Sequence, residues 1–557
     1  MKKEMFRMDS GKGDGSGEES GAESGAARKN AVRGNPSVKN AGVRKAGVRY
    51  AVGKSPAGLS GHAARFCALV SAVLLTLFSA CGTVHAQKEE ASAEVRIVLK
   101  QDGSQASGGG VKVSGNRVTV TRGGSYRITG NLSDGQLCVD AAEEEVTLLL
   151  DGASVVCSGA AAVSVEAAGQ VTIRLEEGTG NLLQSREEPK QEGTEAAEGA
   201  AVFSKEDLII DGSGSLTILG GVEHGIQSRK SLTLSGGVIT AEALEDSFKA
   251  DDCLTISGGS IQTKCGEKAF QADQSMEITG GILTAEAGDD AFHSNRDMQI
   301  SGGSLTIIAG KKGIHADDEL IVDGGEILIT ESFEGLEANQ VLIREGELSI
   351  TAEDDGINAN GEPEGEGEER TLPCLRIQGG EIFIDADGDG VDSNGDLIFE
   401  GGTTVIFGPE DDRNGALDYG SENGGSCILN GGTVLAAGSS GMAVTFSEDS
   451  GQPSFLCFLD FVYEAGDEIR ILDETGRLLF SETAVKSGSS VVFGSPKLEL
   501  GQTCQLVVGE RSVQIKLKSS SVTTRGKGRE NGSGEQASAI FLNETANAGN
   551  ADAPRIC

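Results

Sequence analysis

Carboxylates recur at regular intervals in the middle of the chain, in a pattern that suits a hard metal ion. One set comes just before a short apolar run in successive repeats, and a second set comes just after it. The first set comprises Asp246, Asp289, Asp290, Asp354, Asp355, Asp387 and Asp389. The second set comprises Asp251, Asp317 and Asp392. Carboxylate oxygens on flexible turns are preferred ligands of calcium, so the pattern predicts calcium at these turns.

Stacking such turns has an electrostatic cost that some positive charge must offset. Carboxylates about 4.8 Å apart repel by roughly 3–4 kcal/mol per pair at an effective dielectric of about 20. Lys268, Lys311 and Lys312 interrupt the acidic row and offset part of this cost, and bound calcium would offset the rest. The alternative is that the acidic turns form a solvated face that binds nothing. The stretch from Asp385 to Gly390 matches the start of an EF-hand loop without flanking helices, and is interpreted as a calcium-binding turn of the repeat.

Candidates for catalysis are fewer. Lys249, Lys268, Lys311 and Lys312 lie beside the acidic row and would act as bases if a neighbouring charge lowered their pKa. The alternative is that they only compensate charge. His293 and His315 occupy equivalent repeat positions, as suits a ladder of turn residues as easily as a site. The sequence contains no nucleophile elbow, phosphate loop or spaced catalytic dyad, so no catalytic residue is assigned.

A repeat of about 22 residues positions these groups. Its clearest mark is a Gly-Gly pair, which recurs at Gly236-Gly237, Gly258-Gly259, Gly280-Gly281, Gly302-Gly303 and Gly324-Gly325. Each repeat contains three short alternating runs separated by turns, and no helical run. Repeats of this length stack because no single repeat can bury its apolar face alone. The pattern predicts an all-β parallel β-helix with coils of about 22 residues.

The apolar residues of the repeats predict which side chains stack in the core. The second run would stack Ile239, Ile261, Leu283, Leu305, Ile327, Leu348 and Ile382. The third would stack Ile226, Phe248, Phe270, Phe292, Ile314, Leu336, Ile357 and Val391. Small residues follow the third set two positions later, as an inward-facing strand in a narrow core requires.

The ends of the chain differ in composition from the repeats. An apolar run from Phe66 to Ala80 is typical of a signal-peptide core, and Cys81 directly after it resembles the lipidated cysteine of a bacterial lipobox. The alternative is an ordinary secretory signal. The predicted organisation is a disordered basic leader (1–65), a signal-peptide core with lipobox (66–81), a linker (82–94), the parallel β-helix (95–438), a small C-terminal β cap (439–516) and a disordered tail (517–557).

Charge and composition restrict the class of ligand. The formal net charge of −38 argues against nucleic acid as a partner and favours either cations as ligands or simple solubility outside the cell. The chain has no Trp and four Tyr, so flat aromatic platforms for sugar stacking are scarce. Acidic sugars bridged by calcium therefore fit better than cellulose.

Several motifs together resemble a known family. They are GSYRITGNLSDGQLCVDA, AAVFSKEDLIIDGSGSLTI, GDDAFHSN, DDGINANG, GDGVDSNGDL, NGALDY and GGTVLAAGSSGMA. The stretch from about Val95 to Val513 resembles the clostridial-type carbohydrate-binding β-helix family. The resemblance implies a right-handed parallel β-helix of pectate-lyase-like architecture with calcium in its Asp-rich turns. It also implies surface attachment, and binding of cellulose or polygalacturonate without established lyase activity.

The resemblance can be carried to individual turns. Asp246, Asp251, Asp290, Asp317, Asp355 and Asp389 occupy the matching turn positions. The chain departs from the family pattern at Lys268, at Lys311-Lys312 and at Glu334, which puts calcium binding at those coils in doubt.

The favoured function is a non-catalytic extracellular lipoprotein, anchored to a bacterial membrane, that binds calcium and polysaccharide. The alternatives are a calcium-dependent polysaccharide lyase and a structural, adhesin-like surface protein.

Overall fold

The computed structural model describes residues 94–186, 199–361, 372–526 and 529–530. The predicted leader, the signal-peptide core with Cys81 and nearly all of the linker lie outside these residues. The described residues all belong to one compact unit, Glu90–Cys557. No helix among them is long and apolar enough to span a membrane.

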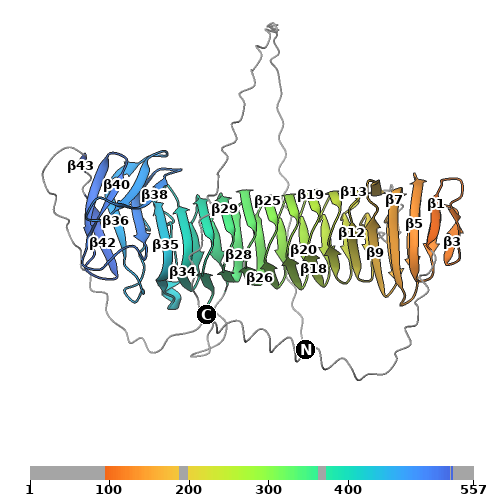
Figure 1. The fold of residues 1–557 in the computed structure, drawn as a ribbon, viewed down its shortest axis with the longest axis horizontal. Helices are drawn as coiled ribbons and strands as arrows, with labels where there is room; N and C mark the ends of the chain where they lie inside the picture. Colours follow the sequence, from red (N-terminus) through yellow and green to blue (C-terminus); the bar gives the residue numbers. More distant parts are fainter. Residues whose placement is uncertain (1–93, 187–198, 362–371, 527–528, 531–557) are drawn as a thin grey trace, which may run out of the picture. The chain divides into compact units, whose positions relative to one another are not determined.

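The unit is nearly all β, and most strands join one large, mainly parallel sheet. Each strand of a coil pairs in parallel with the equivalent strand of the next coil, so three ladders run along the stack (Figure 1). The first ladder contains β1 (Val95–Leu99), β5 (Gly124–Leu132), β7 (Glu145–Ser158), β9 (Gln170–Leu175), β12 (Leu208–Gly212), β15 (Leu232–Leu234), β18 (Cys253–Ile256), β21 (Ser275–Ile278) and β24 (Asp297–Ile300).

The second ladder begins with the later residues of β5 and β7, because both strands are long enough to bend from one ladder into the next. It continues through β10 (Gly180–Arg186), β13 (Ser215–Gly221), β16 (Val238–Ala243), β19 (Ser260–Cys265), β22 (Ile282–Ala287), β25 (Ser304–Ala309), β27 (Glu326–Glu331), β29 (Glu347–Ala352) and β32 (Glu381–Ala386).

The third ladder is built from shorter strands. It contains β4 (Arg117–Val120), β6 (Gln136–Asp140), β8 (Val163–Ala167), β11 (Val202–Ser204), β14 (Ile226–Ser228), β17 (Phe248–Ala250), β20 (Phe270–Ala272), β23 (Phe292–Ser294), β30 (Ile357–Ala359) and β33 (Val391–Ser393). Between β23 and β30, the strands β26 (Lys312–Val322) and β28 (Glu334–Ile343) extend from the third ladder into the first. The first ladder then continues through β31 (Cys374–Ile377), and β34 (Asp396–Phe407) and β35 (Cys427–Gly438) extend from it into the second.

The strand register confirms the core stacks that the repeat predicts. Ile261 pairs with Leu283, and Leu283 with Leu305. In the third ladder, the rings of Phe248, Phe270 and Phe292 are stacked, with centroids 5.2 and 4.7 Å apart. The second glycine of each repeated pair has a φ between 88° and 103°, as at Gly237 and Gly281, which explains why these turns need glycine.

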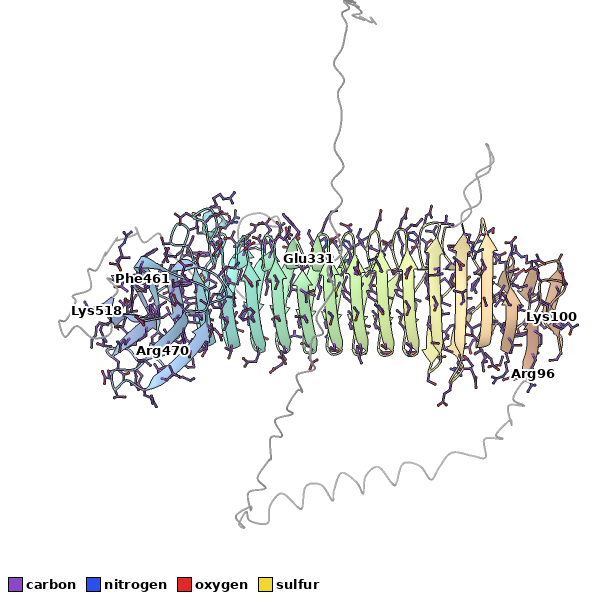
Figure 2. All side chains as sticks on the ribbon, turned by 90° about the horizontal axis from the view of Figure 1, so that it is seen from above. Arg96, Lys100, Glu331, Phe461, Arg470 and Lys518 are labelled. Atoms are coloured by element: carbon purple, nitrogen blue, oxygen red, sulfur yellow. The ribbon has the colours of Figure 1, made fainter. Side chains whose placement is uncertain are left out.

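Both ends of the stack carry additional strands. At the N-terminal end, β2 (Gln105–Ala106) pairs with β1, and β3 (Val111–Ser114) pairs with β4, both in antiparallel fashion. At the other end, β39 (Gly488–Gly494) pairs antiparallel with β35 and so covers the edge of the last coil. β36 (Ser454–Tyr463) and β42 (Ser521–Gly526) extend this sheet. Figure 2 shows Arg96 and Lys100 at the N-terminal end and Phe461, Arg470 and Lys518 at the C-terminal end.

A second, antiparallel sheet completes the C-terminal region. It consists of β37 (Glu468–Leu472), β38 (Leu478–Thr483), β40 (Thr503–Val508), β41 (Arg511–Lys516) and β43 (Arg529–Glu530). The predicted tail, 517–557, begins too early, because β42 lies within it. Val522 and Thr524 of β42 are buried, but the Ser- and Thr-rich composition around them concealed a strand.

Candidate functional site

Polar side chains form a continuous row on the outward side of the third ladder, which we call the third-strand strip. It occupies the middle residue of each strand, between two residues that fill the core. The strip consists of Gln227, Lys249, Gln271, His293, His315, Glu337, Asn358 and Asp392. Gln227, Gln271, Glu337 and Asn358 are each only 6% exposed. The strip is therefore a row of polar groups partly withdrawn from water.

A second row, which we call the turn row, lies three residues before each strip residue from Lys249 onward. It consists of Asp246, Lys268, Asp290, Lys312, Glu334, Asp355 and Asp389. In Asp246 and Asp290, Oδ1 accepts a hydrogen bond of 3.1 Å from the backbone N–H of the turn-row lysine of the next coil. Asp355 accepts one of 2.7 Å from the Asp389 N–H. These bonds link successive coils and leave the second carboxylate oxygen available for other partners.

Four carboxyl groups gather near the C-terminal end of the two rows, and we call them the acidic cluster. It consists of Asp355 and Asp389 of the turn row, Asp392 of the strip, and Asp418. A parallel bridge between Val391 and Leu417 places Asp418 next to Asp392 in the following coil. Within the described residues, no lysine or arginine forms an ion pair with any of the four.

Burial and mutual repulsion disfavour ionisation in the acidic cluster. Burial, together with neighbouring carboxylates, raises the pKa of Asp355 to about 6. Burial and the charges of Asp355 and Asp418 raise the pKa of Asp389 and of Asp392 to about 7. Burial also raises the pKa of Asp418. A nearby cation would reverse these shifts by favouring the charged forms.

Three other predicted metal ligands have basic partners instead. Asp251 forms a 2.9 Å ion pair with Arg229. Asp289 lies between two lysines, 3.0 Å from Lys268 Nζ and 2.7 Å from Lys311 Nζ. Asp387 lies 2.7 Å from the Nζ of Lys486, which comes from the C-terminal region.

The remaining predicted ligands differ in their surroundings. Asp246 is 3% exposed and lies 3.4 Å from His224 and 3.6 Å from Lys249. Asp354 is adjacent to Asp355, and its charge contributes to the raised pKa of that residue. Of the ten predicted ligands, Asp354, Asp355, Asp389 and Asp392 lie near enough for charges within the group to raise the pKa of the last three, but no three of their oxygens converge within 4.8 Å. Asp251, Asp289 and Asp387 are bonded to basic side chains.

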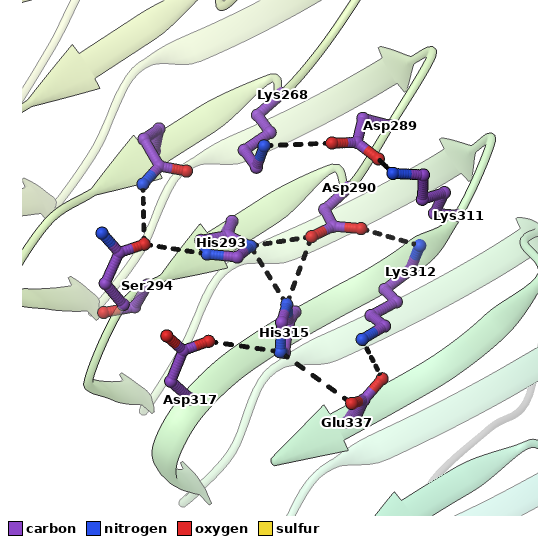
Figure 3. A network of polar contacts seen from close by, with 12 residues as sticks. Lys268, Asp289, Asp290, His293, Ser294, Lys311, Lys312, His315, Asp317 and Glu337 are labelled. Carbon is purple, nitrogen blue, oxygen red and sulfur yellow. Dashed lines mark hydrogen bonds and ion pairs between the residues drawn. The ribbon is translucent and has the colours of Figure 1, made fainter. Parts of the chain in front are cut away.

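A second group combines imidazoles with a carboxylate in the middle of the rows (Figure 3). Oδ2 of Asp290 lies 2.7 Å from His293 Nδ1 and 3.2 Å from His315 Nδ1. Asp317 Oδ1 lies 3.4 Å from His315 Nε2.

The repeat indicates the imidazole pair but not the whole acidic cluster. His293 and His315 are one period apart, which places them one above the other on the strip. Asp418 follows Ala416 and Leu417 as Asp392 follows Gly390 and Val391, but the interval of 26 residues departs from the period. A longer polar stretch between these two coils therefore concealed Asp418 in the sequence.

The sequence matches the family described as "Carbohydrate-binding domain-containing protein" over residues 114–312 and 309–452. The chain belongs to this family. A "Carbohydrate-binding domain-containing protein" of Acetivibrio thermocellus is 31% identical over 183 residues, which is 31% of this chain and 64% of the relative. The match thus spans less than two thirds of that relative's length. A solved "polysaccharide lyase-like protein from C. thermocellum", a gadolinium derivative, is 29% identical with a TM-score of 0.40, over 41% of this chain and 96% of that one.

Proposed function

We propose that this member of the carbohydrate-binding domain family is a non-catalytic extracellular lipoprotein that binds acidic polysaccharide through calcium. The acidic cluster carries the proposal. Its half-buried carboxyl groups supply only oxygen donors, and no lysine or arginine of the described residues neutralises them. Calcium takes six to eight such oxygens in flexible geometry, so the chemistry of these donors suits the ion, although their oxygens would have to move closer together to share it. Asp355, Asp389, Asp392 and Asp418 would hold it, with Asp354 beside them.

The choice of an acidic polymer follows from charge. A calcium ion held by a few protein carboxylates keeps coordination positions that uronate carboxylates and hydroxyls can fill. Without the ion, this strongly acidic surface would repel a uronate polymer. Polygalacturonate is therefore the preferred ligand of this proposal, and cellulose is the neutral alternative.

The proposal includes two further features, the handedness of the coil and the attachment to the cell surface. The three parallel ladders and the 22-residue period support a right-handed parallel β-helix. Cell-surface attachment through a lipid on Cys81 rests on the apolar run and the lipobox-like residues before it, which lie outside the described part of the chain.

The surroundings of the lysines favour binding over lyase chemistry. A β-elimination needs an unprotonated base near neutral pH. Burial lowers the pKa of Lys268, but its bond to Asp289 outweighs burial and raises it overall. The same carboxylate raises the pKa of Lys311. Lys312 is ion-paired with Glu337, and Lys249 lies 3.6 Å from Asp246, so these ammonium groups neutralise carboxylates.

Thermal unfolding of the full chain tests the proposal. We expect calcium to raise the melting temperature relative to a chelator, and polygalacturonate to raise it further only when calcium is present. Calcium at 100 times its dissociation constant would add about 2.7 kcal/mol to the free energy of unfolding. A cellulose pull-down tests binding of the neutral polymer, and an ultraviolet assay for unsaturated products tests lyase activity.

Matched variants locate the effect. Asp389→Asn with Asp392→Asn should abolish the calcium response. Asp251→Asn should retain it, because Asp251 is already paired with Arg229. Calcium-bridged binding would be refuted if calcium left the melting temperature unchanged and the protein retained as much polymer in chelator as in calcium. Calcium-dependent unsaturated products would establish a lyase instead.

A further inference from the structure

Three potential ligand atoms meet at the middle of the third-strand strip. They are Oδ2 of Asp290 and the Nδ1 atoms of His293 and His315 (Figure 3). The carboxylate oxygen lies 2.7 Å from the first nitrogen and 3.2 Å from the second, and the two nitrogens are 3.0 Å apart. The backbone N–H of Lys312 holds Oδ1 of Asp290, so that Oδ2 faces both imidazoles.

A chain of hydrogen bonds determines which nitrogen of His293 carries its proton. Asp273 Oδ1 only accepts, so the Asn295 group 3.3 Å away from it is the NH₂. Asn295 Oδ1 therefore points the other way, accepts from Gln271 Nε2 and lies 2.9 Å from His293 Nε2. That nitrogen must be the donor, which leaves a lone pair on Nδ1 of the neutral ring.

His315 has a similar arrangement. Its Nε2 faces two acceptors, Asp317 Oδ1 at 3.4 Å and Glu337 Oε1 at 4.0 Å. A proton on Nε2 again leaves the Nδ1 lone pair directed toward Asp290. Oxygen acceptors on the far nitrogen of a histidine are the usual partners that orient metal-bound imidazoles.

Three lone pairs at these distances repel one another unless something positive lies between them. A single proton on one Nδ1 leaves the other lone pair facing the carboxylate at 3.2 Å, and protons on both would place two N–H groups head to head at 3.0 Å. With metal–ligand bonds of about 2.0–2.1 Å, neighbouring ligand atoms of a four- or six-coordinate ion lie about 2.9–3.4 Å apart. The contacts of 3.2 and 3.0 Å fall in this range and the contact of 2.7 Å lies just below it, so a metal ion drawn in between the three atoms would relieve their mutual repulsion.

We propose that Asp290, His293 and His315 form a binding site for a transition-metal dication of the zinc type. Imidazole nitrogens favour such ions, whereas calcium prefers an all-oxygen shell like that of the acidic cluster. Asn295 positions the imidazole of His293, and Asp317 lies against Nε2 of His315. Three protein ligands leave a coordination position for water, and both histidine side chains are partly exposed, at 12% and 15%.

Cobalt titration of the metal-stripped full chain tests the site. We expect visible absorption bands of cobalt bound through nitrogen and oxygen, loss of these bands on addition of zinc, and no effect of calcium. His293→Gln and His315→Gln should each weaken binding by at least about tenfold, since even outer-shell changes cost that much. Lys249→Gln, at an equivalent strip position two coils away, should leave binding unchanged.

Two results would overturn the inference. One is cobalt binding that survives in the doubly substituted protein, which would point to another group such as Glu223, His224 and Glu245. The other is displacement of cobalt by calcium at similar concentration. If the variants fail to fold, zinc-edge X-ray absorption of the wild-type chain decides, because two imidazoles must appear in its shell. The test is independent of the calcium and polysaccharide experiments, which use Asp389 and Asp392.

Discussion

Two adjacent carboxyl groups, of half-buried Glu334 and buried Glu337, lie along the rows between His315 and the acidic cluster. Burial, and then the hydrogen bond and charge of Glu337, raise the pKa of Glu334 well above its ordinary value. Burial acts in the same direction on Glu337, but bonds from Glu334 and Lys312 outweigh it and lower its pKa. Glu334 is therefore the protonated member at neutral pH and donates to the Glu337 carboxylate. The shared proton and the Lys312 ammonium group together offset the repulsion between the two carboxyl groups.

This shared proton predicts a pH dependence of stability. Because the pKa of Glu334 is higher in the folded than in the unfolded chain, the folded state binds more protons above the unfolded value, and stability falls as pH rises. Glu334→Gln keeps a hydrogen-bond donor and cannot ionise. In chelator, the free energy of unfolding of the Glu334→Gln protein should therefore fall less than that of the wild type between about pH 5 and about pH 8. Denaturant titrations at several pH values measure the slopes; the exposed Glu331→Gln should retain the wild-type slope, and equal slopes for Glu334→Gln would contradict the shared proton.

At the scale of the strand, the close approach of successive coils explains glycines outside the Gly-Gly turns. A Cβ added at Gly356 would lie 2.3 Å from Cγ2 of Ile384 and 2.5 Å from the carbonyl oxygen of Gly390. Both atoms belong to the following coil, and one is backbone. This glycine therefore fixes the distance between two coils directly beneath Asp355 and Asp389.

Gly356→Ala should destabilise the stack. Overpacking of this kind costs about 1–3 kcal/mol, because neighbouring side chains and backbone have to shift. The matched substitution Gly180→Ala, where an added Cβ meets nothing closer than 3.6 Å, should be nearly neutral. Urea unfolding of both variants measures the difference. Equal stabilities would mean that the coils can separate locally at little cost.

The sequence predicts the strands and their stacking better than it predicts the functional site. Core positions are apolar in every coil, so Phe248, Phe270 and Phe292 could be placed in a stack from their spacing alone. The strip changes type from coil to coil, from Gln271 to His293 to Glu337, and so gives no periodic signal. The backbone bonds of Asp246 and Asp290 are also invisible in sequence, because any polar turn residue is consistent with the pattern. The acidic pattern also predicts Asp251 and Asp289 as metal ligands, because it cannot show that Arg229 pairs with the first, and Lys268 and Lys311 with the second.

Across the whole unit, the C-terminal region does more than cover the last coil. An open edge of parallel strands would pair with other chains, and β39 blocks it by pairing with β35. A side-chain clamp reinforces this contact. Ser487 donates two hydrogen bonds to Glu410, of 3.0 Å from N and 2.6 Å from Oγ. These contacts join segments 77 residues apart, a separation that no local pattern reports.

Lys486 makes the most concentrated of these long-range contacts. Its Nζ lies 2.6 Å from Asp385 Oδ1 and 2.7 Å from Asp387 Oδ1, and donates a 2.9 Å hydrogen bond to the carbonyl oxygen of Ala386. The ammonium group thus neutralises two carboxylates, Asp385 and Asp387, of the stretch that resembles an EF-hand loop. Lys486→Met keeps the aliphatic stem and removes the charge. It should cost about 1–2 kcal/mol, because the lysine side chain is largely buried but Asp387 is solvated.

The region that loses protection from hydrogen exchange distinguishes this clamp from an ordinary ion pair. In Lys486→Met, hydrogen exchange should accelerate first in β37 to β41, while the coils before β32 stay protected, since stacked repeats depend mainly on their neighbours. Lys264→Met removes a lysine from an exposed pair with Glu286 and should change stability by less than about 0.5 kcal/mol. If both substitutions leave exchange in the C-terminal strands unchanged, the pairing of β39 with β35 holds that region in place without the lysine.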